Sequence, residues 1–204
     1  MTLPRAIIFD LYDTLLHLEH TTRPYARLIA ALSLIGEADM RRARAIALTE
    51  EHPSLDSYVK RVSPSATIDL SAFERSIDAE LASARNYPET INVLALLRSR
   101  IPYLGIITNI ATPYKAPYYA CGLSEYLPDV LFSCAAGMMK PDPRMYSTLL
   151  ERWGVAPSDA LMIGDSVRCD VEGPKAIGMR AVHLDRKGII PATIATLDGV
   201  FQFL

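Results

Sequence analysis

Five short runs of apolar residues limit this 204-residue chain to a small group of folds. They lie at residues 6–9, 104–108, 130–133, 160–164 and 181–184. The runs are continuous rather than alternating, which is typical of strands covered on both faces of a parallel sheet. Helical patterns precede each of the last four, at residues 88–100, 114–123, 142–154 and 167–179. This alternation predicts an α/β fold with a doubly wound, Rossmann-like parallel sheet.

The region between the first two runs breaks the alternation. Its patterns are helical throughout and contain no strand candidate. The helical stretches lie at residues 23–36, 37–51, 54–62 and 70–85. We therefore expect an inserted all-helical segment over residues 17–87, called the cap below. Residues 1–16 and 88–204 are expected to form the Rossmann-like core.

Composition and charge narrow the classes of function. Half of the residues are hydrophobic and 22% are charged, enough apolar material for a packed core. A net charge of −2 gives no footprint for nucleic acid, and no apolar run reaches the roughly 18 residues that span a bilayer. The N-terminus does not resemble a signal peptide, and three widely spaced cysteines indicate free thiols in a reducing compartment. We expect a cytoplasmic monomer or homodimer that acts on a small molecule.

Polar residues follow four of the predicted strands. They are Asp10, Tyr12, Asp13 and Thr14 after the first, Thr108 and Asn109 after the second, Lys140 in the loop after the third, and Asp165, Ser166 and Asp170 after the fourth. In an open parallel sheet, ligands bind outside the carboxyl ends of the strands. Any single acid there could be a turn or helix cap. All four groups in this order indicate a shared active-site cleft.

These motifs resemble those of the haloacid dehalogenase superfamily of hydrolases. The matching patterns are D-x-x-x-T from Asp10, an apolar strand ending in T-N at Thr108, K-P at Lys140 and "GDSVRCD" around Asp165. The position of the cap and the closing segment "IATLDGVFQFL" are also similar, so the resemblance covers nearly the whole chain.

The resemblance implies catalytic roles for Asp10, Thr14, Thr108 and Lys140. Asp10 would be the nucleophile, forming a covalent aspartyl intermediate. Thr108 and Lys140 would hold the transferring group and offset its charge, and Lys140 would also keep Asp10 ionised. Thr14 would brace the nucleophile loop. Tyr12, Asn109 and Lys140 are expected to contact the substrate.

A magnesium site is implied at the same place. Asp10, Asp165 and Asp170 would bring three carboxylates together, and such groups repel one another unless a cation lies among them. Mg²⁺ suits hard oxygen ligands, of which the protein supplies only a few. We expect Asp10, Asp165 and the backbone carbonyl of Tyr12 as direct ligands, with Asp170 in direct or supporting contact.

Tyr12 departs from the pattern of the family's phosphatases, which usually carry a second Asp at this position. That Asp protonates the leaving group and then activates water, a contribution of roughly 10²–10⁴-fold in rate. A phenol with an ordinary pKa of about 10 is a poor base near neutral pH. The sequence therefore predicts a slow Mg²⁺-dependent phosphohydrolase that acts on small phosphorylated metabolites with good leaving groups.

Two alternatives remain open. The family's haloacid dehalogenases also carry a Tyr here and need no metal, because a halide leaves without a proton; Asp165, however, would repel an anionic haloacid. The second alternative is a catalytically impaired homologue that binds a phosphorylated ligand. Retention of Asp10, Thr108 and Lys140 argues against it.

The cap is expected to close over the pocket and to supply substrate contacts. Candidates for reaching a substrate anion are Arg23, Tyr25, Arg27, Tyr58 and Arg61. The basic run at residues 40–45 is interpreted as the solvated face of a helix. His17 is a possible substitute proton donor.

Overall fold

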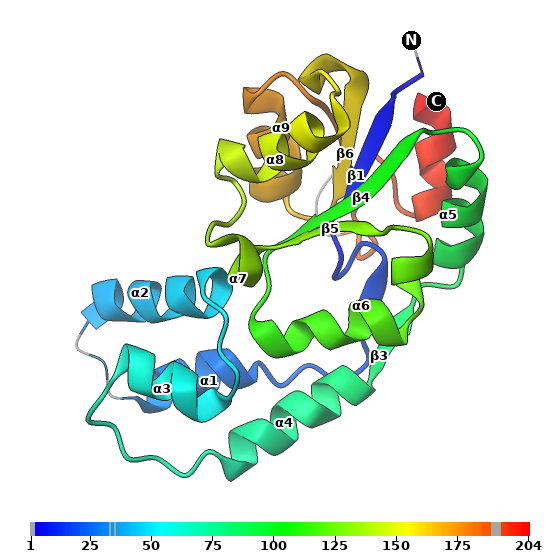
Figure 1. Ribbon diagram of the computed structural model, residues 1–204. Helices are drawn as coiled ribbons and strands as arrows, with labels where there is room; N and C mark the ends of the chain where they lie inside the picture. Colours follow the sequence, from blue (N-terminus) through cyan, green and yellow to red (C-terminus); the bar gives the residue numbers. More distant parts are fainter. Residues whose placement is uncertain (1–2, 33, 35, 189–192) are drawn as a thin grey trace.

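Five parallel strands form the sheet at the centre of the core (Figure 1). The computed structural model describes residues 3–32, 34, 36–188 and 193–204. The strands are β1 (Ala6–Phe9), β4 (Tyr103–Thr108), β5 (Asp129–Phe132), β6 (Ala160–Gly164) and β7 (Arg180–His183). Their order in space is β5-β4-β1-β6-β7. The predicted doubly wound parallel sheet is confirmed, with β1 at its centre.

Side chains of β1 alternate between the two faces of the sheet. Ile7 and Phe9 pack on the face covered by α5 (Thr90–Arg98), α6 (Ala116–Ala120) and the C-terminal 3-10 helix η5 (Leu197–Phe203). Ala6 and Ile8 pack on the opposite face, under α8 (Pro143–Trp153). All four side chains are fully buried. Because both faces of the sheet are covered at β1, the sequence of this strand is apolar throughout instead of alternating with polar residues.

The other helices of the core are short. They are η1 (Thr112–Lys115), η2 (Leu123–Glu125), α7 (Ser133–Ala136), η3 (Pro157–Asp159), the π-helical turn η4 (Val167–Glu172) and α9 (Gly173–Ala176). The helix predicted over residues 167–179 is therefore a π turn followed by one α turn. This wider turn returns Asp170 toward β6, where its carboxylate accepts a hydrogen bond from the Ser166 backbone N–H.

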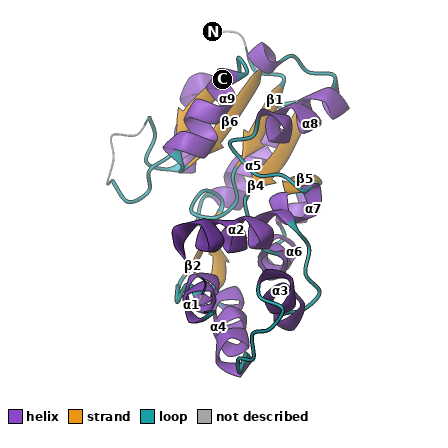
Figure 2. Cartoon of the chain, turned by 90° about the vertical axis from the view of Figure 1, so that its left-hand side faces the viewer, coloured by secondary structure: helices purple, strands orange, loops and turns teal. Residues whose placement is uncertain are grey.

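Four helices form most of the cap, which lies below the sheet in Figures 1 and 2. They are α1 (Pro24–Ala31), α2 (Gly36–Thr49), α3 (Leu55–Val62) and α4 (Ser71–Ala82). Their apolar faces enclose a cluster of their own, which includes Leu28, Ile46, Tyr58 and Ile77. Part of the first predicted helical stretch, at residues 33 and 35, lies outside the described residues.

The expectation that residues 17–87 contain no strand was wrong. Residues Leu16–Leu18 (β2) and Ala84–Asn86 (β3) form a short antiparallel ribbon where the chain passes between core and cap. Three residues are too few to produce a periodic pattern, and each strand pairs with a segment far away in the sequence. We propose that the ribbon marks the boundary between the core and a cap of residues 17–87.

The structure also bears on membrane-spanning helices and on the state of the cysteines. No helix in the described ranges is long and apolar enough to cross a membrane. Cys121, Cys134 and Cys169 are free thiols, as their odd number and spacing predicted.

Candidate active site

Asp10 lies where the winding of the sheet reverses. Its strand, β1, stands between β4 and β6, so the connections on either side run in opposite directions and leave a crevice at the carboxyl edge. The Asp10 backbone N–H still donates to the Ile163 carbonyl at 2.9 Å, which extends the pairing with β6. The Asp10 side chain therefore starts from a rigid point, and the residue is only 8% exposed.

Lys140 connects two of the acids. Its Nζ lies 2.7 Å from Asp10 Oδ1 and 2.6 Å from Asp170 Oδ1, and the residue is 3% exposed. Burial disfavours the ammonium, but the charges of Asp10 and Asp170 outweigh it and raise the pKa of Lys140 above its ordinary range. Lys140 is therefore a fixed positive charge beside Asp10.

Asn109 positions the backbone of Lys140. Its Nδ2 donates to the Lys140 carbonyl and its Oδ1 accepts from the Lys140 N–H, both at 2.8 Å. This pair joins the end of β4 to the loop that carries the lysine. The sequence predicts a substrate contact for Asn109, and this role stays a prediction. The amide nitrogen and the amide oxygen of its side chain are both hydrogen-bonded to the Lys140 backbone.

Asp170 is fully buried and both of its oxygens are engaged. Oδ1 accepts from Lys140, and Oδ2 accepts from the Ser166 N–H at 3.0 Å. A Cβ atom on Gly164 would lie 2.3 Å from Asp170 Oδ2. Only glycine at the end of β6 leaves room for this carboxylate, which accounts for the glycine that precedes Asp165 in the motif.

Asp165 is the most accessible of the three acids. No Lys or Arg of the described chain lies within salt-bridge distance of its carboxylate, and its backbone carbonyl lies 3.0 Å from His183 Nε2. Partial burial of the carboxylate, with the charges of Asp170 and Asp13 nearby, raises the pKa of Asp165 to about 6.

The three acids form a cluster that fits a divalent cation. Asp10, Asp165 and Asp170 each offer an oxygen within 4.8 Å of the others. Burial raises the pKa of Asp10 to about 7, with Asp170 and Asp165 adding to the effect of burial and Lys140 opposing it. Three carboxylates and one ammonium leave two negative charges, which a hard divalent ion such as Mg²⁺ would neutralise.

Thr14 and Thr108 are buried at the same edge of the sheet. Thr108 ends β4 and is 2% exposed, whereas Thr14 is fully buried. The Thr14 hydroxyl has no hydrogen-bond partner among the described residues, and its carbonyl accepts from Arg186 at 2.7 Å. At Thr14, the loop after β1 is therefore bound through its backbone rather than through the hydroxyl.

Sequence reasoning missed Arg186. Its guanidinium lies 3.5 Å from the centre of the Tyr87 ring and 2.6 Å from Glu89, besides binding the Thr14 carbonyl. These contacts tie the loop after β7 to the loop after β1. A single arginine following the last strand carries no local pattern that reveals such a role.

Tyr12 is held against Tyr114, a residue of η1 in the core. Its hydroxyl donates to the Tyr114 carbonyl at 2.9 Å, and the two rings meet edge to face with centroids 6.0 Å apart. Burial raises the pKa of Tyr12 above its ordinary range, so the phenol is a weaker acid than usual. Asp13 pairs with Lys187 at 3.2 Å rather than joining the other carboxylates.

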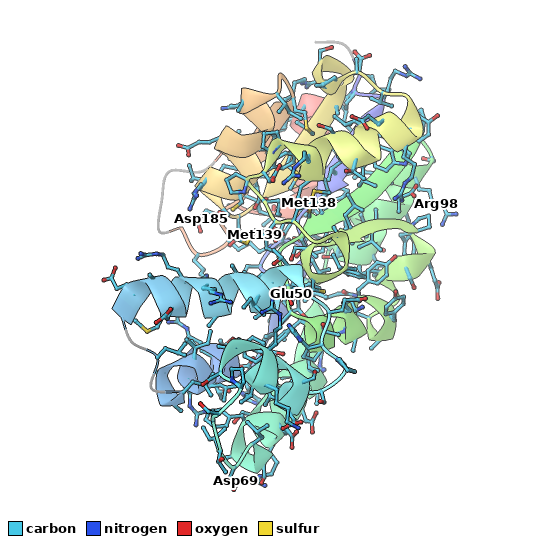
Figure 3. All side chains as sticks on the ribbon, turned by 60° about the vertical axis from the view of Figure 1, so that its left-hand side comes forward. Glu50, Asp69, Arg98, Met138, Met139 and Asp185 are labelled. Atoms are coloured by element: carbon cyan, nitrogen blue, oxygen red, sulfur yellow. The ribbon has the colours of Figure 1, made fainter. Side chains whose placement is uncertain are left out.

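A cleft of about 1040 Å³ separates the core from the cap. Tyr12, Asp13 and Asn109 line it on the core side. Tyr12 and Asp13 follow Asp10 closely in the sequence, and Asn109 hydrogen-bonds to Lys140, so the cleft opens beside the loops that carry Asp10 and Lys140. Met138 and Met139, just before Lys140, lie between the core and α2 (Figure 3).

The cap residues predicted to reach a substrate anion differ in where their side chains lie. Arg23 and Tyr25 line the cleft, as does His17. Arg27 stacks on Phe73, Arg61 pairs with Glu50 at 2.8 Å, and Tyr58 is fully buried. Arg44 also lines the cleft, although the basic run that contains it was interpreted as a solvated helix face.

The fold and the site together define a capped α/β protein: helices are inserted after the first strand of a doubly wound sheet, and three acids meet at its carboxyl edge. The family model described as haloacid dehalogenase-like hydrolase matches residues 4–178, and the chain belongs to this family.

Several curated relatives are named phosphatases. Phosphoglycolate phosphatase of Rhodospirillum rubrum is 30% identical over 98% of this chain and 87% of its own length. Glyceraldehyde 3-phosphate phosphatase of Methanopyrus kandleri is 26% identical over 89% of this chain and 84% of its own. Phosphoserine phosphatase of Thermus thermophilus is 39% identical, but the match spans only 49% of this chain and 41% of that protein.

Solved structures share the fold. A haloacid dehalogenase-type phosphatase from Thermococcus onnurineus superposes with a TM-score of 0.67 at 25% identity, covering 98% of this chain and 97% of that one. A dehalogenase with an intermediate complex superposes with a TM-score of 0.69 at 20% identity, covering 100% and 98%. The second likeness shows the fold alone.

Proposed function

We propose that this protein is a Mg²⁺-dependent phosphohydrolase that cleaves small phosphorylated metabolites through an aspartyl-phosphate intermediate on Asp10. The observation that carries the proposal is the cluster of three carboxylates at the carboxyl edge of the sheet, two of which pair with Lys140. The phosphatase names of several relatives support it. The cytoplasm is the expected compartment, and the protein would act as a monomer or homodimer.

Asp10 would attack in line with the leaving group. Lys140 holds Oδ1, so Oδ2 is the oxygen left to form the bond to phosphorus. The bond between phosphorus and the ester oxygen then breaks, and the leaving group departs as an anion that takes a proton from water. Water attacks the phosphorus of the aspartyl phosphate in a second step, which releases inorganic phosphate and restores the Asp10 carboxylate.

Asp10, Asp165 and the Tyr12 backbone carbonyl would hold Mg²⁺. The bound ion supplies positive charge that offsets the negative charge of the phosphoryl oxygens. Asp170 acts by support, because both of its oxygens are already bound by Lys140 and the Ser166 N–H. Thr108 and Lys140 would contact the transferring phosphoryl group.

Tyr12 sets the range of substrates that react quickly. Its hydroxyl donates to a backbone carbonyl, and its pKa is raised by burial, so it does not protonate a leaving alkoxide. Esters whose leaving group departs as a stable anion need no such proton. Aryl and acyl phosphates should therefore react much faster than alkyl phosphates.

The test is phosphate release from p-nitrophenyl phosphate, with Mg²⁺ and with EDTA. We expect turnover that needs the metal and falls at least 10³-fold in Asp10→Asn. Asp13→Asn is the matched control, because Asp13 lies three residues away and points to Lys187 instead. Asparagine also tolerates the left-handed backbone at this position, where φ is 58°.

The same protein should be tested for halide release from 2-chloropropionate, because Tyr12 is the residue that a dehalogenase would carry. Halide release without metal, and no phosphate release, would overturn the proposal. Beryllium fluoride with Mg²⁺ should bind at Asp10 in a phosphoryl-transfer enzyme. Absence of both this complex and turnover would indicate a binding protein.

A further inference from the structure

The cleft between core and cap is lined by two arginines whose side chains form no salt bridge among the described residues. Three cations line it, Arg23, Arg44 and Lys187. Lys187 is paired with Asp13. Arg23 and Arg44 form no salt bridge within the described part of the chain, and both are exposed. Some other arginines of the cap are paired with acids, such as Arg61 with Glu50 at 2.8 Å.

Besides Asp13, the acid among the described lining residues is Glu80, and both of its carboxylate oxygens accept hydrogen bonds. It is 2% exposed and accepts hydrogen bonds from the Thr22 hydroxyl at 3.0 Å and the Arg23 N–H at 2.8 Å. Its second oxygen accepts from the Tyr114 hydroxyl at 2.5 Å. Glu80 therefore fixes the backbone of Arg23 and leaves its guanidinium to other partners.

The backbone of each arginine belongs to an ordered part of the cap, the start of α1 for Arg23 and helix α2 for Arg44. Arg23 precedes α1 in a left-handed conformation, with φ of 53°, which is uncommon for a residue with a side chain. Arg44 lies on α2, one helical turn before Ala47 and Leu48, which line the same cleft. Both guanidinium groups therefore belong to the cap side of the cleft.

The walls of the cleft include aromatic as well as aliphatic side chains. Tyr12 and Tyr114 line the core side, while Tyr25 lines the cap side. The Tyr25 and Tyr114 rings lie 6.3 Å apart. These surfaces suit a flat or apolar substrate body with an anion at its far end.

We infer that Arg23 and Arg44 bind a second anionic group of the substrate, so that the enzyme selects phosphate monoesters carrying a carboxylate or a second phosphate. This inference rests on the proposed function, because the first anion is the phosphoryl group at Asp10. Guanidinium groups suit both kinds of anion, since their planar donors match carboxylate and phosphate oxygens.

Binding to the Asp10→Asn protein in Mg²⁺ tests the inference without turnover. Calorimetry would compare phenyl phosphate, 4-carboxyphenyl phosphate and 1,4-phenylene bisphosphate. The two probes with a second anion should bind at least tenfold more tightly than phenyl phosphate. Preference for only one of the two shows whether the second group is a carboxylate or a phosphate.

Substitution of the arginines then locates the preference. Arg44→Gln or Arg23→Gln is added to the Asp10→Asn protein. Either substitution should lower the ratio of the affinity for a doubly anionic probe to the affinity for phenyl phosphate at least fivefold. Arg42→Gln is the matched control, because Arg42 lies on the same helix but lines a different and smaller hollow. It should leave the ratio within a factor of two.

Equal affinities for the three probes, or a ratio that survives both substitutions, would overturn the inference. The experiment distinguishes failure of this inference from failure of the proposed function. A protein that prefers doubly anionic probes through Arg23 and Arg44, yet releases no phosphate from any ester, retains the anion site and loses only the reaction.

Discussion

Lys140 Nζ lies 2.6 Å from Asp170 Oδ1, in a salt bridge from which water is almost excluded. The same ammonium lies 2.7 Å from Asp10, so Asp170 helps to fix the position of Lys140 beside the proposed nucleophile. Under the proposed function, Asp170 would influence the reaction without contacting the substrate.

Replacement of Asp170 by Asn should therefore lower kcat roughly 10–100-fold, with KM changed less. The amide keeps the shape and one acceptor, but it removes the charge that holds Lys140 in place. Steady-state kinetics on p-nitrophenyl phosphate would measure this effect, and circular dichroism would verify the fold. An Asn variant with unchanged kcat would show that the lysine needs no second acid.

Gly164→Ala should act on the same pair indirectly. The new methyl group would lie 2.3 Å from Asp170 Oδ2 and must displace it. We expect a loss of about 1–3 kcal/mol in unfolding free energy and at least a tenfold loss of kcat. Gly105→Ala is the control, because its Cβ would meet Trp153 and the Asp129 carbonyl at 2.8 Å. That variant should lose stability while its folded molecules keep their kcat.

Mg²⁺ binding should depend on pH and release protons. The pKa of Asp10 is raised to about 7 and that of Asp165 to about 6, so both are partly protonated at pH 6. These carboxyls must lose protons before they bind the ion, and affinity should therefore rise between about pH 5.5 and 8. Calorimetry in buffers of different ionisation enthalpy would detect the released protons. A pH-independent affinity would contradict the assignment of these ligands.

Tyr12→Asp should restore a proton donor at the position where the family's phosphatases have one. We expect kcat on alkyl phosphates to rise at least tenfold relative to aryl phosphates. Tyr12→Phe removes only the hydrogen bond to the Tyr114 carbonyl and should leave the alkyl-to-aryl ratio unchanged. The ratio of the two rates is the measurement, and a lower ratio in Tyr12→Asp would refute the role given to Tyr12.

Glu80→Ala should destabilise the protein by about 2–4 kcal/mol, since it leaves the partly buried donors, the Arg23 N–H and the Tyr114 hydroxyl, without their acceptor. Urea unfolding would measure the loss. Glu74→Ala is the control, because Glu74 is exposed on the same helix and should change stability by less than about 0.5 kcal/mol. Equal effects of the two variants would mean that Glu80 is not an organising residue.

The core was predictable from sequence because its signals are local. Each strand is a run of apolar residues, and the acids follow strands whose ends meet at one edge of a parallel sheet. The positions of Asp10 and Asp165 follow from that topology alone. The π turn after β6 was missed, since its geometry depends on the contact between Asp170 and Gly164 rather than on a repeat.

Contacts between distant segments were not predictable. Arg44 has the same local pattern as its neighbours Arg41 and Arg42, yet only Arg44 of these three lines the cleft between cap and core. Arg41 pairs with Glu37 at 2.9 Å, as a solvated helix face would. The difference arises from how α2 is placed against the core, which a helical repeat does not encode.

The β2–β3 ribbon has a practical consequence for separating the two halves of the molecule. Leu16 is paired with Asn86, so the points where the chain leaves and re-enters the core are immediate neighbours. A tight turn joining them would bypass all four cap helices without stretching the sheet. Such a minimised hydrolase would retain the acids around Lys140 but lack Arg23 and Arg44, which makes it a direct way to separate chemistry from substrate choice.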